Sequence, residues 1–426
     1  AASAPPPKRR RVRAKQHEQH DAAVRIDVVL TAYGTVRSDA EKLSAPKMFA
    51  GLVLDEAQQI KNPKTQLSNS LNQIAKEVGP LRVALTGTPV ENGLTDLYSI
   101  IEFILPGYLS SKENFQKDFA GRLKLAARKG KTSEDQKALD LLNRLKAPFV
   151  LRRSKTDNEI EADLPEKLEK TYVCELGKEQ RTLYQKVQES LWMGCASEQD
   201  SNERSRKVMD MMHALREVCN HPACLKKERR PPGFQSSKHF PPISTVDASG
   251  KCAMFHSLLN HIMKIKEKTL VFCQSHSAID ALVHQIEQRK DMRKFGQKAL
   301  RITGRTEPKH REANIEAFQT DPKCPILVMS QVGGVGLTLT AATHVIHFDR
   351  QYNPAKENQA TDRAHRIGQT QKVSVYYLVS QDTFEVRLAE ILEQKRQLSD
   401  MTMQSCQNFF SQMNNEELQE FFSLKS

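Results

Sequence analysis

Short runs of apolar, often β-branched residues alternate with polar segments of helical pattern along most of the chain. An early series lies at Ile26–Leu30, Met48–Leu54 and Arg82–Leu85, and each run is followed by polar residues and then a helical pattern. A later series comprises Thr269–Cys273, Ala299–Thr303, Ile326–Ser330, His344–Phe348 and Val373–Val379. Repeated strand, loop and helix units predict an α/β fold with parallel sheets, whose ligands bind at the carboxyl ends of the strands.

The segments between these two series have a different pattern. Residues 102–148 are charged and helical in spacing, and residues 165–249 also read as largely helical. The Pro-, Ser- and Gly-rich stretch 230–250 predicts an exposed linker. Two further amphipathic helices are expected at 385–398 and 416–422. The chain therefore divides into two α/β units around a helical middle.

Composition narrows the class of protein. Of the 426 residues, 38% are hydrophobic and 27% charged, and the sequence shows neither an apolar run of membrane-spanning length nor the apolar core of a signal peptide. The 8 cysteines are scattered, which fits a reducing compartment. The net charge of +13 favours a polyanionic partner, because basic charge attracts phosphate backbones regardless of sequence.

The first 24 residues predict a basic disordered tail. The segment Pro7-Lys8-Arg9-Arg10-Arg11-Val12 resembles a nuclear-localisation signal. An ordinary basic loop that faces DNA or solvent explains the same residues equally well. The expectation of a nuclear protein rests on this cluster.

Two carboxylates follow the predicted strand that ends at Leu54. Mg²⁺ prefers a carboxylate, reached through water, together with phosphate oxygens, and Asp55 suits that role. Glu56 suits the orientation and polarisation of an attacking water. In the next strand-end segment, Leu85–Asn92, Gly87 allows a sharp backbone turn.

The segment Asn353–Gln369 has the most specific pattern in the chain. Gln359, Arg363 and Arg366 stand three and four residues apart, so they are expected on one face of a helix. Two guanidiniums on one short face need an anion opposite, and guanidinium forks match phosphate oxygens. Upstream, Gly333, Gly334 and Gly336 follow a predicted strand, where glycines can expose amide donors to phosphate.

These motifs, in this order, resemble those of SWI/SNF-type ATPases, a branch of the superfamily-two helicase-like proteins. The resemblance runs from about Val28 to the C-terminus. It implies two RecA-like lobes, the first incomplete, joined by helical insertions. It also implies ATP and Mg²⁺ as substrate and cofactor, double-stranded DNA as partner, nucleosomes as a further candidate partner, and translocation in remodelling or repair as the activity.

The resemblance also implies a domain order. Residues 1–24 form the tail, 25–165 a partial first lobe with a helical insertion near 106–147, and 166–250 a helical protrusion and linker. Residues 251–380 form the second lobe, and 381–426 form a C-terminal helical brace.

Residue roles follow from the same resemblance. The expected catalytic residues are Asp55, Glu56, Arg363 and Arg366, with Asp55 serving Mg²⁺ through water. The expected nucleotide-binding residues are Gln58, Thr86, Gly87, Thr88, Gly334, Gly336 and Gln359. The expected DNA-binding residues are Thr31, Tyr33, Arg152, Arg153, Arg301, Gly333 and Thr338. Gln58 stands where the family more often has His, which keeps a hydrogen-bonding group. A buried core position explains Tyr33 equally well.

A phosphate-cradling GxxxxGK[ST] loop is not found. Gly130-Lys131-Thr132 imitates its end, but position 125 is Leu and no buried strand precedes it. The family's loop is expected N-terminal to Val28, so the chain, which begins at Ala1, is expected to be the C-terminal portion of a longer enzyme that does not hydrolyse ATP alone. A natural short form that binds DNA or a partner is the alternative, and an RNA helicase shares the fold.

The cluster Cys219-Asn220-His221-Pro222-Ala223-Cys224 invites a zinc interpretation. Structural zinc needs a second ligand pair at a suitable distance, and Cys252 and His256 are isolated. The sequence therefore predicts no zinc site.

Overall fold

The structure, a computed structural model, describes residues 28–45, 49–87, 94–123, 132–153, 164–236, 240–294, 296–330, 336–397 and 413–424. The predicted tail, residues 1–24, lies outside them, as do the candidate site residues Thr88, Gly333 and Gly334. The chain forms two compact units, one of residues 1–50 and 64–80 and the other of residues 51–63 and 81–426. Among the described residues, no helix is both long and apolar enough to cross a membrane.

The described residues of the smaller unit form three helices, α1 (Tyr33–Ser38), α2 (Ala40–Leu43) and α3 (Gln66–Glu77). The hydroxyl of Thr65 accepts the N–H of Ser68 and caps α3. Leu71 and Ile74, three residues apart, are buried on one face of α3. Val36 of α1 is also buried.

The predicted buried strand at 26–30 is wrong for the residues that the structure describes. Val28, Val29 and Leu30 are exposed and form no strand. A strand is stable only when its backbone groups pair with a neighbour, and no described segment pairs with these three. The β-branched side chains of Val28 and Val29 indicate a propensity for strand, and propensity alone does not form one.

In the larger unit, β1 (Gly51–Leu54) and β2 (Leu81–Ala84) form a parallel two-stranded sheet, at the positions that the apolar runs predict. Both strands are less buried than expected, with Val53 61% and Leu81 59% exposed. The 3-10 turn η1 (Ala57–Ile60) follows β1. The helical segment after β2 comprises α4 (Leu94–Ile104), α5 (Lys112–Phe115), the π-helical turn η2 (Gln116–Ala120) and α7 (Ser133–Lys146), packed around a small core of their own.

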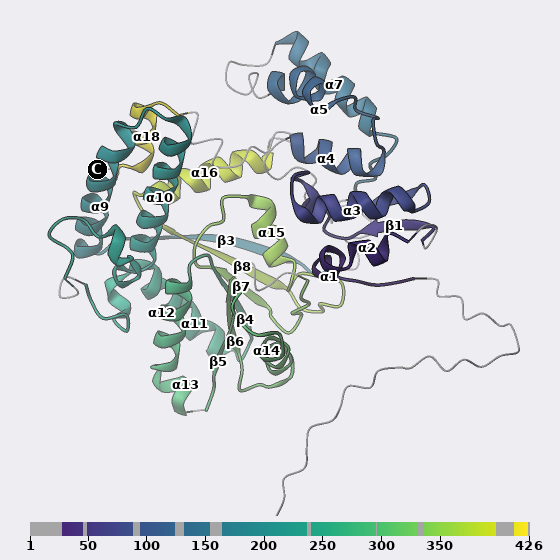
Figure 1. Ribbon diagram of the computed structural model, residues 1–426. Helices are drawn as coiled ribbons and strands as arrows, with labels where there is room; N and C mark the ends of the chain where they lie inside the picture. Colours follow the sequence, from purple (N-terminus) through teal and green to yellow (C-terminus); the bar gives the residue numbers. More distant parts are fainter. Residues whose placement is uncertain are drawn as a thin grey trace, which may run out of the picture. The chain divides into compact units, whose positions relative to one another are not determined.

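The main sheet has six strands in the order β3-β8-β7-β4-β6-β5, all parallel (Figure 1). The strands are β3 (Lys167–Cys174), β4 (Thr269–Cys273), β5 (Ala299–Ile302), β6 (Ile326–Ser330), β7 (His344–His347) and β8 (Val373–Ser380). The central strands β4 and β6 are buried along their whole length, as expected of strands covered on both faces. The second series of apolar runs therefore predicts five of the six strands.

The strand β3 was expected to be helical. It lies at the edge of the sheet and pairs with β8 over eight residues. Most of its side chains are exposed, so the sequence Lys-Leu-Glu-Lys-Thr-Tyr-Val lacks the apolar run that marks the inner strands.

Helices cover both faces of the main sheet. α11 (Gly250–Lys264) and α12 (His276–Glu287) pack on one face, and α14 (Pro308–Thr320) and α15 (Pro354–Thr361) on the other. The alternation of β4 shows the division, since Val271 and Cys273 face the first core and Leu270 and Phe272 face the second. The short helix α13 (Lys290–Lys294) leads into β5.

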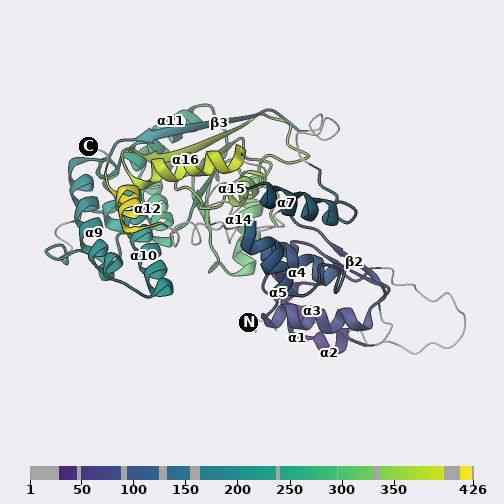
Figure 2. The same ribbon diagram turned by 90° about the horizontal axis from the view of Figure 1, so that it is seen from above.

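A helical bundle of α9 (Lys178–Ala196), α10 (Ser201–Asn220), α16 (Phe384–Gln397) and α18 (Asn415–Phe422) adjoins the sheet; Figures 1 and 2 both show these helices side by side. Its core includes Tyr184, whose hydroxyl donates to the carbonyl of Phe422. The predicted exposed linker at 230–250 is only partly exposed. It contains the 3-10 turn η6 (Val246–Ala248), Ser249 is fully buried, and Gln285 of α12 donates to the carbonyl of Ile243.

Candidate functional site

Asp55 and Glu56 leave the carboxyl end of β1 through a strained turn. Glu56 has a φ of 50°, in the left-handed region that few residues other than glycine adopt. Its N–H donates to the Asp55 carboxylate at 2.9 Å. Backbone strain of this kind often occurs at functional sites, where the surrounding structure enforces it.

Gln58 joins the segments that follow β1 and β2. Its side-chain amide donates to Glu56 Oε2 at 2.6 Å, and its Oε1 accepts the hydroxyl of Thr86 at 2.7 Å. Backbone hydrogen bonds reinforce the pairing, since Leu85 N–H donates to the carbonyl of Leu54 at 2.7 Å. The amide therefore provides the hydrogen-bonding role expected of this position, and it does so in a group that does not titrate near neutrality.

Gln359 of α15 also approaches Glu56. Its side-chain nitrogen lies 3.5 Å from Glu56 Oε2, a long contact. A Cβ at Gly87 would lie 3.7 Å from the same nitrogen, in ordinary van der Waals contact. The structure thus brings together four residues, Glu56, Gln58, Thr86 and Gln359, from three segments that are far apart in sequence.

Arg363 lies half-buried in the same region. Burial lowers the pKa of its guanidinium, the charge of Glu56 opposes that change, and the nearby charge of Arg366 adds to it. Arg363 is therefore a partly desolvated cation near the carboxylate that is expected to orient water. Charges in such surroundings act more strongly on a substrate than they would in bulk water.

The expectation that Gln359, Arg363 and Arg366 share one helical face is wrong. α15 ends at Thr361, and the following amides of Arg363 and Ala364 bond three residues back, which tightens the chain into turns. Arg366 is exposed and donates to the hydroxyl of Thr338 at 3.2 Å. Both arginines still lie near each other, but loops rather than a helix present them.

Buried contacts that the sequence did not indicate hold α15 in place. Arg350 and Glu357 form a two-pronged ion pair with both distances 2.8 Å, and the side chains are 7% and 0% exposed. Glu357 also accepts the N–H of Gln351. His347 stacks between the rings of Phe272 and Tyr377 and bonds the hydroxyl of Thr361 at 2.9 Å.

Gln369, at the end of the arginine-bearing motif, is a further structural residue. Its buried amide donates to the carbonyls of Thr340 and Ala342 at 2.9 Å. The loop that contains Thr338 is thereby tied to the turn that contains Arg366. Gly336 in the same loop has a φ of 76°, which glycine adopts without strain.

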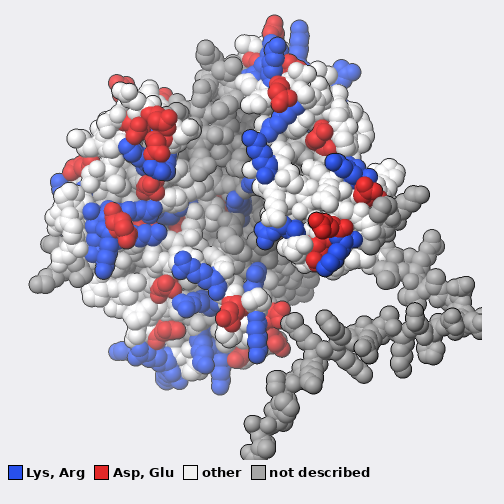
Figure 3. All heavy atoms as spheres, in the orientation of Figure 1, with Lys and Arg blue, Asp and Glu red and all other residues white. Residues whose placement is uncertain are grey.

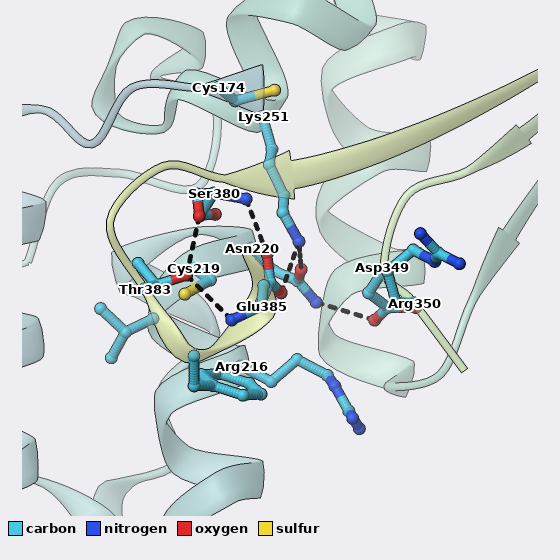
Figure 4. Close-up of polar contacts among 12 residues, drawn as sticks. Cys174, Arg216, Cys219, Asn220, Lys251, Asp349, Arg350, Ser380, Thr383 and Glu385 are labelled. Atoms are coloured by element: carbon cyan, nitrogen blue, oxygen red, sulfur yellow. Dashed lines mark hydrogen bonds and ion pairs between the residues drawn. The ribbon is translucent and has the colours of Figure 1, made fainter. Parts of the chain in front are cut away.

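Four further buried polar side chains form a hydrogen-bonded cluster, which we call the lysine lock. Its members are Asn220, Lys251, Asp349 and Glu385. Lys251 donates to Glu385 at 2.7 Å and to Asn220 at 3.3 Å, and Asn220 donates to Asp349 at 2.9 Å (Figure 4). Burial lowers the pKa of Lys251, but the charges of Glu385 and Asp349, the hydrogen bond to Glu385 and the nearby Cys219 together outweigh it, and the pKa ends above its usual value. Burial raises the pKa of Asp349, against the charges of Arg216 and Lys251.

The lysine lock connects α10, α11 and α16 to the chain between β7 and α15. Asp349 accepts the N–H of Gln274, whose side chain donates to the carbonyl of Arg350. Arg350 in turn holds Glu357 of α15. A continuous set of hydrogen bonds therefore runs from the helical bundle to the helix that carries Gln359.

The candidate DNA-binding residues are spread over the surface. Thr31 is exposed and Tyr33 half-buried in the smaller unit, so neither is a core residue. Arg152 and Arg153 are exposed in the larger unit. Arg301 pairs with Asp280 at 2.8 Å, with both side chains 58% exposed.

Cys219 and His221, which invited a zinc interpretation, have structural roles. His221 accepts the N–H of Ala223 through Nδ1 at 3.1 Å, and its Nε2 lies 3.0 Å from the carbonyl of Thr245. Burial raises the pKa of the Cys219 thiol, which disfavours the thiolate that metals bind. Among the described residues no three His, Cys, Asp or Glu side chains are grouped to hold a metal.

Two known domain families match this chain. Residues 7–224 match the SNF2-related domain, and residues 250–368 match the helicase conserved C-terminal domain. The chain is 35% identical over 94% of its length to the putative ATP-dependent helicase/translocase YwqA of Bacillus subtilis. It is 31% identical over 96% of its length to an uncharacterised ATP-dependent helicase of Mycoplasma genitalium. It spans 40% and 36% of these two relatives.

Among solved structures, the SWI2/SNF2 ATPase core of Sulfolobus solfataricus in complex with double-stranded DNA matches with a TM-score of 0.52 and 31% identity. The match covers 92% of this chain and 76% of that one. The parallel sheets thus correspond to the two RecA-like lobes of that core. The chain belongs to the SNF2-related family.

Proposed function

We propose that this chain is part of an ATP-driven motor that moves along double-stranded DNA. The observation that carries the proposal is the meeting of Glu56, Gln359 and Arg363 at the carboxyl ends of parallel strands. An acidic residue that orients water, next to partly buried guanidinium, is what hydrolysis of a phosphoanhydride requires. Relatives named as ATP-dependent helicases, and a similar core crystallised with duplex DNA, support the same activity.

Each residue has a definite task in this proposal. Glu56, held by Gln58, orients the attacking water. Arg363 and Arg366 stabilise the negative charge that builds on the transferred phosphoryl group. Gln359 approaches the same carboxylate and so makes its position depend on α15.

The donor set near β1 fits Mg²⁺. Asp55 is exposed at the strand end, and a hard carboxylate oxygen that leaves room for water is the ligand that Mg²⁺ prefers. When bound, the ion would neutralise charge on the phosphate oxygens. The hydroxyl of Thr86 donates to Gln58, so it ties the segment after β2 to the segment after β1.

We further propose that residues 1–426 alone bind nucleotide weakly and do not turn it over. The sequence contains no GxxxxGK[ST] segment, whose amides and lysine supply most of the contacts to the β- and γ-phosphates. A DNA-binding form without turnover is the alternative physiological role for the same sequence. Residence in the nucleus stays a prediction that rests on the basic cluster at 8–13. Action on nucleosomes stays a prediction that rests on the family resemblance.

The test uses purified residues 1–426 and a Glu56→Gln variant. We expect salt-sensitive binding of duplex DNA by both proteins and no ATP turnover above the level of the variant. Turnover that Glu56→Gln abolishes would contradict the proposed weak nucleotide binding. Tighter binding of single-stranded RNA than of duplex DNA would favour an RNA helicase instead.

A further inference from the structure

The two edges of the main sheet differ in length and in cover. The edge strand β5 has four residues, and the carbonyl of Arg301 on its outer side accepts the side-chain amide of Asn314 at 3.0 Å. The opposite edge strand, β3, has eight residues, most of them exposed, and Figure 1 shows it beyond β8. A long exposed edge strand is a template on which another strand can form hydrogen bonds. The β3 edge is therefore the open edge of the sheet.

The backbone of β3 offers hydrogen-bonding groups on its outer side. The N–H of Val373 donates to the carbonyl of Glu166, and the parallel ladder that follows uses the even-numbered residues of β3. The odd-numbered residues therefore direct their N–H and C=O groups away from β8. In the described part of the chain, no strand pairs with this side, and three of these residues form no backbone hydrogen bond: Lys167, Thr171 and Val173.

The side chains of β3 combine exposed apolar surface with charges of both signs. Leu168 is 49% exposed and Val173 is 54% exposed, on opposite faces of the strand. The charged residues are Lys167, Glu169 and Lys170. On the face drawn in Figure 3, Lys and Arg side chains are likewise interspersed with Asp and Glu side chains, so charge of one sign does not mark a partner there. Mixed charge on an edge strand can instead select the register in which that strand pairs.

Charge limits the registers in which β3 can pair antiparallel with a second copy of itself. A two-fold axis perpendicular to the sheet keeps every side chain on its own face, so the axis passes beside one residue of each strand. An axis beside Lys167 or Lys170 places two lysines opposite each other, and one beside Glu169 places two glutamates there. An axis beside Tyr172 places Glu169 opposite Glu175. Like charges directly opposite each other destabilise a strand pair, so these registers are unfavourable.

An axis beside Leu168 fits the charges but not the backbone. It brings Lys167 opposite Glu169, which is favourable. Its outer pairs, however, fall on residues that precede β3. Pro165 has no N–H to donate, and its carbonyl is already bonded to Nε2 of His365 at 2.8 Å. Pairing in this register is therefore short.

An axis beside Thr171 fits both the charges and the backbone. Every pair then stays within β3, whereas an axis beside Val173 would run past its last residue, Cys174. The two Thr171 residues lie opposite each other, and Lys170 lies opposite Tyr172. These two residue types already suit each other within one chain, where the ammonium group of Lys170 lies 4.6 Å from the ring centre of Tyr172. The sequence of β3 is therefore self-complementary about Thr171.

We propose that β3 pairs in antiparallel fashion with β3 of a second copy of this chain, with Thr171 at the two-fold axis. The two Thr171 residues exchange N–H···O=C bonds, and the two main sheets join into one. The proposal goes beyond the proposed function, because it requires neither DNA nor nucleotide. A single pair of short strands buries less than the roughly 1,200 Å² of a stable interface, so we expect weak association that depends on concentration.

The experiment measures self-association of purified residues 1–426 by sedimentation equilibrium, without DNA or nucleotide. The test variants are Thr171→Lys and Thr171→Glu, each alone and then mixed in equal amounts. The matched controls are Thr320→Lys and Thr320→Glu, which place the same charges at an exposed threonine of α14. Urea unfolding of each preparation verifies that the variants are folded.

We expect the unmodified chain and the controls to form dimers as concentration rises. Each Thr171 variant alone should dimerise about fivefold more weakly, because like charges meet at the axis. The mixture should regain the lost affinity as a heterodimer, since a lysine then faces a glutamate. A change at any other place in an interface would not give this reciprocal result.

Thr171→Pro tests the backbone rather than the side chain. It removes the N–H at the axis but leaves the ladder with β8 intact, because this N–H points away from β8. We expect this variant to stay monomeric at every concentration at which the unmodified chain dimerises. Its urea unfolding should still be cooperative, which separates lost association from lost folding.

Three results would overturn the inference, and none of them bears on the proposed function. An unmodified chain that is monomeric at all concentrations refutes the pairing. A dimer that all three Thr171 variants leave unchanged places the interface elsewhere in the chain. A mixture that associates no better than its two components refutes the position of the axis, and loss of the dimer in Leu168→Lys alone would assign the axis to Leu168.

Discussion

The candidate catalytic cluster and the lysine lock are both polar, but the chain holds them in opposite ways. Glu56 and Gln359 are half-buried and 3.5 Å apart, and Glu56 stands on a strained backbone. In the lysine lock, Lys251 and Glu385 are 0% and 2% exposed and 2.7 Å apart. The first arrangement is partly open to solvent, whereas the charged groups of the second are fully enclosed and paired with each other.

This difference separates residues that act on a substrate from residues that hold the fold. A buried charge without a partner costs several kcal/mol, so the lysine lock is tightly specified by its own energetics. Exposed or half-buried groups can remain poorly paired until a substrate arrives, and hydrogen bonds in such sites often shorten only in the complex. Changes in the two clusters should therefore affect different measured quantities.

Arg366→Ala should produce the largest effect, and it should be confined to turnover. In a longer form that contains a phosphate-binding loop, loss of an arginine finger is expected to lower the rate by about 10³–10⁵. DNA affinity should change little, because phosphate contacts elsewhere hold the duplex. Turnover and DNA affinity are measured on one preparation.

Arg366→Lys is the control for that experiment. An ammonium group cannot reproduce the planar fork, so it should restore little activity. Because Arg366 bonds Thr338, a DNA-binding role is the competing explanation. A proportional loss of DNA affinity and turnover would establish that role and remove the finger assignment.

Lys251→Met should affect stability rather than recognition. It leaves Glu385 buried without its cation, which typically costs about 3–5 kcal/mol. The free energy of unfolding, measured by urea denaturation, should fall by that amount. Adding Glu385→Leu should restore most of the loss, since a well-packed apolar pair often replaces a buried ion pair at little cost. A double variant as unstable as the single one would show that Lys251 has a further essential contact.

The inner strands show what the sequence could predict. β4 and β6 begin and end at the predicted residues. Strands that are buried on both faces consist of nearly continuous apolar residues, so the sequence marks their bounds. The same rule fails at the sheet edge, where β3 is largely exposed and carries charged residues. It also fails at Val28–Leu30, where apolar residues find no strand to pair with.

The candidate site also contains residues that the motifs indicated and residues that no motif indicated. The motif order assigned Glu56, Gln359 and Arg363 to nucleotide binding and catalysis, and those roles stay predictions. The structure places Gln359 and Arg363 near Glu56, with Arg363 in a turn rather than on the expected helix. Arg350–Glu357 and the lysine lock could not be predicted, since each joins ordinary charged residues whose burial depends on the whole fold. His213 shows this as well, because its proximity to Arg229, which lies beyond the end of α10, appears only in three dimensions.

The pH dependence of stability tests a third polar region, around His213. Burial, followed by the charges of Arg216 and Arg229, lowers the pKa of His213 from 6.5 to about 4. The unfolded chain therefore binds more protons than the folded chain between these values, and stability falls as pH drops from 6.5 towards 4. The fall should approach about 1.4 kcal/mol per pH unit for this group.

His213→Gln should flatten that part of the stability curve. Burial also lowers the pKa of His221, His256 and His344, so the comparison with the unmodified chain isolates the contribution of His213. The measurement is urea unfolding at several pH values between 4 and 7. Parallel curves for the two proteins would mean that the folded chain accommodates the charged imidazole.

Arg301→Gln should have the smallest effect. Arg301 belongs to neither cluster, so this variant tests an exposed ion pair against the two clusters. The ion pair with Asp280 is 58% exposed on both sides, so its loss should change the free energy of unfolding by less than about 0.5 kcal/mol. If Arg301 also contacts a DNA phosphate, the slope of log affinity against log salt should fall by about 0.9. Asp280→Asn is the matched control, since it breaks the same pair but removes negative charge, and it should leave the slope unchanged. An equal slope for Arg301→Gln and the unmodified chain would show that Arg301 forms an exposed ion pair with Asp280 and does not contact DNA.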